Sequence, residues 1–393
     1  MKLIPSSLKL EIDGRISRIQ RHMVSADLQV MLVASNVNLY YTTGRFFRGY
    51  VYIPAIGEVI WFIIKPESYE TEENVIYIRK PEDMPQVLEQ KGYPLPSQIG
   101  LEFKSLVYSD FLRLSKIFGT TEISDCSSIL STVRMIKTEW EISEMKVDGL
   151  RQANVYRKVP ECYKPGMTDI ELQIEIEREL RLEGCLGMAR TAGNLMDINL
   201  GSVIVGDNAD VPGPYDFTMA GAGADPSLPV GASGREIQNG ESIMIDMNGS
   251  FNGYQTDMTR VWQLGSLTEF AYKCHECSRH ILRVLEREAL PGVPVSALYD
   301  KAMEIVEAED LKKWFMGHAS QVQFIGHGVG IELNEPPVIM KKSRDILSEN
   351  MTIAIEPKFV IPHIGAVGVE NTYVVTKKGL VSLTIFPEEI MNL

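Results

Sequence analysis

The chain has 393 residues, of which 45% are hydrophobic and 23% are charged, a composition typical of a soluble globular protein. This length exceeds what one hydrophobic core usually spans, so two domains are expected. The formal net charge of -13 argues against nucleic acid or an anionic membrane as the main partner.

Export and membrane insertion are not expected from the sequence. The N-terminal stretch MKLIPSSLKLEIDGR has no apolar core of a leader peptide, and no apolar run reaches the ~18 residues of a transmembrane helix. The five cysteines form no disulfide framework, so a reducing cytoplasm is expected. Cys274 and Cys277 have CxxC spacing, but they lie in a helix-like stretch without a second pair, so we interpret them as ordinary helix residues.

The first part of the chain alternates strand-like and helix-like segments, which predicts an α/β domain over residues 1–130. Strands are predicted at 28–35, 59–64 and 98–103, and helices at 12–24 and 109–118. We place the domain break near Ser131. Thr138 and Glu141 form a capping box that begins a long helix, which is predicted to end near Arg157 in a second domain, 131–393.

The second domain contains an internal repeat. Residues 164–184 resemble residues 290–310, since each segment opens with Pro-Gly and continues into an amphipathic helix. The strand-like segments 239–248 and 348–357 also correspond. The second domain is therefore predicted to be α+β, with two related halves. Between its repeated parts, residues 186–238 are rich in Gly, Pro, Asp and Asn, and form either a surface loop or the wall of a pocket.

Each half of the repeat offers a pair of carboxylates on a predicted hairpin. Asp246 lies in the apolar run Ile-Met-Ile-Asp-Met, and Glu356 occupies the corresponding place in the other half. Asp257 and Glu370 stand in the strands that follow. An Asn-Gly turn at 252–253 pairs Asp246 with Thr259, a turn one residue earlier pairs it with Asp257, and both registers put the two Asp on one face. A turn centred on His363 sets Glu356 opposite Glu370.

Four carboxylates facing one interior repel each other unless cations neutralise them. Two divalent ions bring +4 against -4, and metal pairs about 3.5–4 Å apart are a common hydrolytic device. His327, between Gly326 and Gly328, is the histidine we nominate as a further ligand. Such an oxygen-rich set with one imidazole suits manganese, iron, cobalt or zinc. The plainer alternative, carboxylates that face water or cap turns, does not explain four of them arranged by the repeat.

These residues resemble the motifs of the pita-bread metallopeptidase family, which includes methionine aminopeptidases, aminopeptidase P, prolidases and creatinases. The segment SNVNLYYTTG resembles part of the N-terminal domain of prolidases and creatinases, and RMIKTEWEISEMK resembles the family's entry helix. The resemblance implies that Asp246 binds one metal and that His327 and Glu356 bind the other, with Asp257 and Glu370 bridging both. It also implies a water between the ions as nucleophile, with Glu356 as its general base, and a homodimer.

The chain departs from the family at positions that contact substrate. Val230 and Asn334 stand where family members usually carry histidines, although the amide of Asn334 is still able to donate a hydrogen bond to an oxyanion. Gly368 stands where prolidases often have an arginine, so a substrate carboxylate would need another anchor. Candidates for that anchor are Arg45, Arg190 and Arg235. His363, at a predicted hairpin tip, is a further candidate for a metal or substrate contact.

The resemblance implies metal-dependent hydrolysis of small peptides at Xaa-Pro bonds, as in an Xaa-Pro dipeptidase or aminopeptidase P. Two other functions are compatible with the same fold. One is C–N hydrolysis or lyase chemistry on a non-peptide substrate, which the two missing histidines favour. The other is a non-catalytic metal-binding homologue, which the complete set of ligands disfavours.

Overall fold

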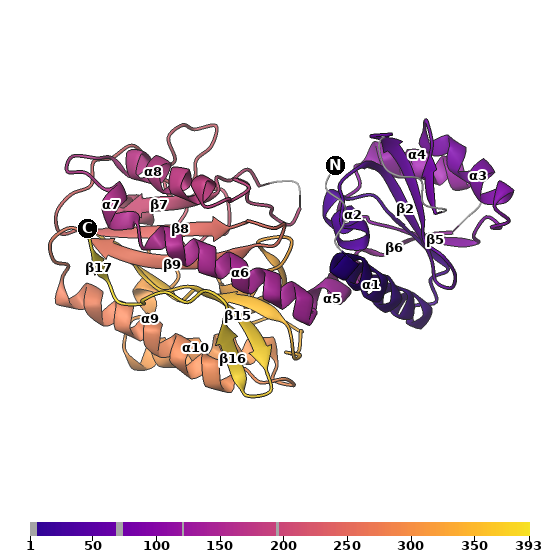
Figure 1. The fold of residues 1–393 in the computed structure, drawn as a ribbon. Coiled ribbons are helices and arrows are strands. Elements are labelled where there is room, and N and C mark those ends of the chain that lie inside the picture. The colour runs from indigo at the N-terminus through magenta and orange to yellow at the C-terminus, as the bar shows by residue number, and fades with distance from the viewer. Residues whose placement is uncertain (1–5, 68–73, 120–121, 194–195) are drawn as a thin grey trace. The chain divides into compact units, whose positions relative to one another are not determined.

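The computed structural model describes residues 6–67, 74–119, 122–193 and 196–393, and divides into two compact units, Met1–Arg134 and Met135–Leu393 (Figure 1). The sequence places the break near Ser131. Residues 1–5 of the expected non-leader segment lie outside the described residues. Among the described residues, no helix is long and apolar enough to cross a membrane.

The N-terminal unit is built around a six-stranded sheet of order β4-β3-β2-β1-β5-β6. The strands predicted at 28–35, 59–64 and 98–103 are confirmed as β1, β3 and β5. Its strands are β1 (Val30–Val33), β2 (Arg48–Pro54), β3 (Ile60–Lys65), β4 (Val75–Tyr77), β5 (Gln98–Leu101) and β6 (Glu122–Asp125). Its helices are α1 (Ser6–Ser25), α2 (Asn36–Thr43), α3 (Met84–Gln90) and α4 (Tyr108–Phe118), and α5 (Ser127–Met135) ends at the boundary.

The C-terminal unit begins with helices that pack on a four-stranded sheet of order β17-β9-β8-β7. The capping box of Thr138 and Glu141 is confirmed at the start of its first helix. The helices are α6 (Glu139–Tyr156), α7 (Val159–Cys162) and α8 (Asp169–Leu182). The strands are β7 (Gly201–Val205), β8 (Ser242–Gly249), β9 (Thr256–Gln263) and β17 (Met391–Asn392).

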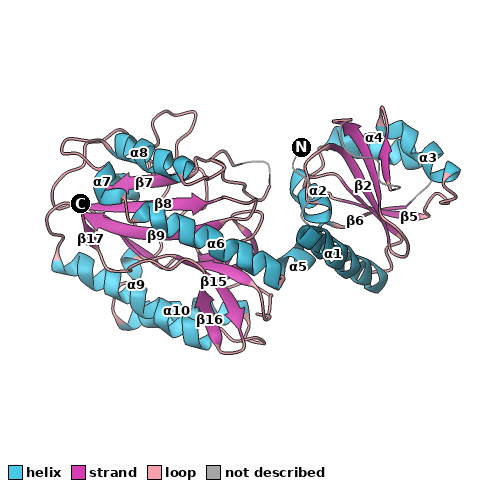
Figure 2. Ribbon diagram, viewed as in Figure 1, coloured by secondary structure: helices cyan, strands magenta, loops and turns pink. Residues whose placement is uncertain are grey.

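The other half of this unit packs two helices against a five-stranded sheet of order β11-β10-β12-β15-β16 and a two-stranded sheet, β13-β14. Figure 2 shows the strands of both halves gathered between the helices. The helices are α9 (Glu269–Glu288) and α10 (Val295–Ala308). The strands are β10 (Phe324–Gly328), β11 (Glu335–Met340), β12 (Thr352–Ile355), β13 (Lys358–Ile361), β14 (Gly365–Gly368), β15 (Asn371–Thr376) and β16 (Gly379–Ser382). Cys274 and Cys277 are free, buried residues of α9, as the helix interpretation predicts.

The two carboxylate hairpins differ in their continuity. The first is an unbroken β8–β9 ladder. The second changes sheet halfway, since β12 pairs with β15 as far as Ile355 and Asn371, and β13 pairs with β14 from Lys358 and Gly368. Glu356 and Glu370 lie in the interruption between these two ladders. Pro357 has no N–H to donate, which is one physical reason why the ladder breaks there.

Asp148 on α6 is a fully buried carboxyl group whose Oδ2 accepts a hydrogen bond from the Phe251 N–H at 3.3 Å. Its Oδ1 has no hydrogen-bond partner among the described residues. Burial is the largest cause that raises the pKa of Asp148, to about 7. The folded protein therefore keeps a proton that the unfolded chain releases near pH 4.

This buried acid predicts a pH-dependent stability that Asp148→Asn removes. Because the folded-state pKa is raised, the stabilisation is present below about pH 4 and is lost as the pH rises to about 7, at up to ~1.4 kcal/mol per pH unit. Urea denaturation between pH 4.5 and 8 checks this. The free energy of unfolding of the wild type should fall relative to that of the variant as pH rises; parallel profiles would contradict the assignment.

Candidate active site

The five residues proposed as metal ligands line one cavity of about 720 Å³ in the C-terminal unit. They come from both halves of the repeat. Asp246 is on β8, Asp257 on β9 and His327 on β10, while Glu356 and Glu370 occupy the interruption between the ladders of the second hairpin. The internal repeat thus brings residues more than a hundred positions apart in sequence to one place.

The first hairpin has the register that the Asn-Gly turn predicts. Asp246 lies opposite Thr259, and Asn248 lies opposite Asp257, so the alternative pairing of Asp246 with Asp257 is excluded. The backbone N–H of Asp257 donates to Thr372 Oγ1 at 2.8 Å, and the Thr372 hydroxyl donates to the Asp257 carbonyl at 2.9 Å. These two bonds fix β9 against β15 and so fix the distance between the two carboxylate strands.

His327 is oriented for binding through Nε2. Its Nδ1 lies 3.1 Å from the Gly328 carbonyl, which accepts a hydrogen bond only if Nδ1 carries the proton. Nε2 then has a free lone pair directed at the carboxylates, 3.8 Å from Asp257 Oδ2 and 3.8 Å from Glu356 Oε1. Ligand atoms of Asp257, His327 and Glu370 all lie within 4.8 Å of one another, a separation that one ion can close.

Two oxygens of this cluster show that the residues fit a cation. Asp257 Oδ1 and Glu370 Oε1 are buried and have no hydrogen-bond partner among the described residues. Burial, followed by the charge of Glu370, raises the pKa of Asp257 well above its usual value. Burial also raises the pKa of Glu370 to about 8, against the opposing effect of Lys358. A divalent ion would supply the positive charge that these oxygens lack.

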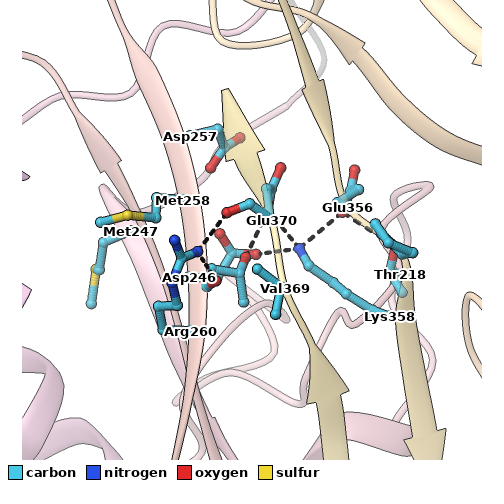
Figure 3. Close-up of polar contacts among 12 residues, drawn as sticks. Thr218, Asp246, Met247, Asp257, Met258, Arg260, Glu356, Lys358, Val369 and Glu370 are labelled. Atoms are coloured by element: carbon cyan, nitrogen blue, oxygen red, sulfur yellow. Dashed lines mark hydrogen bonds and ion pairs between the residues drawn. The ribbon is translucent and has the colours of Figure 1, made fainter. Parts of the chain in front are cut away.

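Lys358 is the one lysine or arginine among the described residues that line the cavity, and the ligand set inferred from sequence leaves it out. Figure 3 shows its side chain reaching in between Glu356 and Glu370. Its Nζ donates to Asp246 Oδ2 at 2.9 Å, to Glu356 Oε2 at 2.9 Å and to Glu370 Oε2 at 2.8 Å. Burial alone would lower the pKa of Lys358, but these carboxylates raise it well above its usual value. A signal was present in the sequence, because a lysine stands two residues after Glu356 in an apolar strand.

The walls of the cavity include residues of segment 186–238, among them Gly201, Ser202 and Ile204 of β7, a strand that was not predicted from the sequence. Val230 and Asn334 both line the cavity. Val230 is buried and adds apolar surface. Asn334 Oδ1 accepts a hydrogen bond from the Ala192 N–H at 2.8 Å, which orients the amide and leaves its NH2 group as the remaining donor.

The structure does not place His363 with these residues. It lies at the tip of the β13–β14 hairpin with φ 65°, its side chain is 90% exposed, and its Nδ1 faces Asp207 Oδ2 at 3.2 Å. Two of the arginines considered as anchors, Arg190 and Arg235, do not line the cavity. Arg235 pairs with Glu241 at 2.6 Å, and Arg45 belongs to the other compact unit.

Comparison with known proteins adds two matches that together span most of the chain. Residues 143–377 match the model of metallopeptidase family M24, and residues 15–136 match the creatinase/prolidase N-terminal domain. The Xaa-Pro dipeptidase of Pyrococcus horikoshii is 26% identical over 384 residues, which cover 97% of this chain and 99% of the relative.

Solved structures have the same fold. The prolidase of Pyrococcus horikoshii OT3 superposes with a TM-score of 0.78 at 24% identity, covering 96% of this chain and all of that one. An Xaa-Pro dipeptidase from Bacillus anthracis gives 0.79 at 20% identity, covering 97% of this chain and all of its own. The expected pita-bread architecture, with an α/β N-terminal domain, is confirmed.

Proposed function

Because the chain belongs to metallopeptidase family M24, we propose that it is an exopeptidase that cleaves small peptides at Xaa-Pro bonds. The observation that carries the proposal is the convergence of Asp246, Asp257, His327, Glu356 and Glu370 in one cavity. Relatives that match nearly the whole chain have Xaa-Pro dipeptidase as their name, which supports the choice of substrate.

The residues of the cavity suit three tasks. A divalent cation, when bound, supplies Lewis acidity to the scissile carbonyl. Glu356 is the proposed general base, since Lys358 and Thr218 contact its Oε2 while Oε1 stays on the His327 side. Asn334 is the proposed donor to the oxyanion, because its NH2 group is free of the Ala192 contact. Val230 provides apolar contact but no donor.

Proline release tests this proposal. Purified protein is loaded separately with manganese, cobalt and zinc and is given a panel of Xaa-Pro dipeptides and longer Xaa-Pro peptides. We expect release that requires metal and ends on chelation. Cleavage of dipeptides alone would indicate an Xaa-Pro dipeptidase, and cleavage of longer peptides an aminopeptidase P.

A protein that holds metal but releases no proline would contradict the peptide assignment. Val230 and Asn334 then favour the second candidate, a C–N hydrolase or lyase acting on a non-peptide substrate. Val230 and Asn334 both line the cavity, at the positions where the family resemblance implies histidines that stabilise a peptide oxyanion. The replacement of these histidines therefore affects the cavity itself. Ammonia or amine release from small amides would be the assay.

The cellular setting and assembly belong to the same proposal. A reducing cytoplasm is supported by five cysteines that are all free thiols. A homodimer is proposed from the family resemblance, and sedimentation of the full chain measures it.

A further inference from the structure

The ammonium group of Lys358 is fully used by the cluster. An ammonium has three N–H donors, and three carboxylates accept from Lys358 Nζ at 2.8–2.9 Å. The side chain is only 2% exposed, so water contributes little to its solvation. Asp246, Glu356 and Glu370 therefore bind the ammonium group of Lys358 as they would bind a metal cation (Figure 3). All three belong to the set of carboxylates proposed as metal ligands.

The backbone opposite Lys358 makes room for it. Gly368 pairs directly with Lys358 in the β13–β14 ladder and has φ 147°. A Cβ at Gly368 would lie 2.5 Å from the Pro357 carbonyl oxygen and 2.8 Å from Lys358 Cα. Gly368 is also the position at which the sequence lacks the arginine expected of prolidases. The absence of that arginine and the presence of Lys358 therefore occur at one directly paired position of the β13–β14 ladder.

The part of the cluster that Lys358 does not reach is still short of positive charge. Asp257 Oδ1 and Glu370 Oε1 have no partner among the described residues, and His327 Nε2 faces the same space. The charge balance follows directly. Four carboxylates carry -4, Lys358 brings +1 and one divalent ion brings +2, which leaves -1. A second divalent ion would take the cluster to +1 and would have to displace a buried ammonium from three acceptors.

We infer that Lys358 takes the place of the second metal ion, so that each chain binds one divalent cation at Asp257, His327 and Glu370. Asp246 then pairs with the lysine and is not essential for holding the ion. This inference rests on the proposed function, because it concerns the same site. Its test measures the number of bound ions per chain, and that number does not depend on whether proline is released.

The experiment is Mn2+ titration of the full-length protein by calorimetry, with bound metal counted after gel filtration. We expect one Mn2+ per chain in the wild type and two in Lys358→Met, which removes the ammonium but keeps a side chain of similar length. Lys378→Met, an exposed lysine between β15 and β16, is the matched control and should bind one. The paramagnetic resonance spectrum of the wild type should show isolated Mn2+ without exchange coupling.

Two aspartate variants keep the inference testable if Lys358→Met does not fold. Asp246→Asn should retain the single Mn2+, whereas Asp257→Asn should lose it. Two ions or an exchange-coupled spectrum in the wild type would overturn the inference while leaving the peptidase proposal intact. One ion in both the wild type and a folded Lys358→Met would overturn it as well, and no ion in the wild type would overturn both proposals.

Discussion

Asp257→Ala is expected to abolish metal-dependent peptide hydrolysis while leaving the fold intact. Asp257 is one of the three residues whose ligand atoms converge within 4.8 Å, so its loss removes a ligand that neighbouring residues do not replace. Loss of a residue that only supports a metal ligand lowers activity by up to about 100-fold. Loss of a ligand itself should therefore lower kcat/KM by more than about 100-fold. Initial rates of proline release at saturating Mn2+ give the measurement.

The fold should survive because the side chain of Asp257 contributes little to it. Its Oδ1 has no partner among the described residues, and the bonds to Thr372 come from the backbone, which alanine keeps. Circular dichroism and thermal unfolding check this point. Asp300→Ala, on the exposed face of α10, is the control for loss of an aspartate and should keep full activity. A folded Asp257→Ala protein with wild-type rates would refute the metal site.

The register of the first carboxylate hairpin could be predicted from a local signal, since of the two registers considered the one centred on Asn252-Gly253 is observed. The ladder ends at the pair Gly249 and Thr256, so residues 250–255 form a longer loop than a two-residue turn, but the register still puts Asp246 and Asp257 on one face. The capping box of Thr138 likewise sets the start of α6. In each case a few neighbouring residues decide the geometry, so distant contacts are not needed to infer it.

The register of the second hairpin, with Glu356 opposite Glu370 about a turn centred on His363, is also confirmed, but the interruption of its ladder could not be predicted because it depends on contacts between segments. Its ladder is interrupted beside Pro357, and the carboxylates stand in the interruption rather than in a continuous strand. Lys358 was outside the expected ligand set for a related reason. A lysine in an apolar strand is understood only when its three acceptors, which come from β8 and from both sides of the interruption, are seen together.

The elements that were not predicted include the seven-residue strand β2 and the eight-residue helix α2, together with several short strands. β4 and β6 have three and four residues, and β7 lies inside a segment whose Gly and Pro content indicates loop. Such strands form because a neighbouring strand supplies the hydrogen bonds, as β8 does for β7. Their own sequences carry too little alternation to distinguish a strand from a loop.

Asn334→Asp is expected to lower kcat by about 100-fold with a smaller effect on KM, because it removes a donor to the transition state. Aspartate has nearly the same shape as asparagine, so the substitution changes the chemistry of the side chain more than its size. Aspartate keeps an oxygen to accept the Ala192 N–H and replaces only the NH2 group. Steady-state kinetics on an Xaa-Pro dipeptide, with Asn154→Asp on the exposed face of α6 as control, measure the split between kcat and KM.

Asn334→His separates a weakened peptidase from a site adapted to another substrate. An imidazole restores the side chain expected of peptidases at this position, so kcat for Xaa-Pro cleavage should rise by several-fold if asparagine is only a poorer donor. A fall in the histidine variant together with an unchanged rate in Asn334→Asp would show that the NH2 group does not face a peptide oxyanion. Asn334 and Val230 would then define a pocket for a different carbonyl compound, with the same carboxylates beneath it.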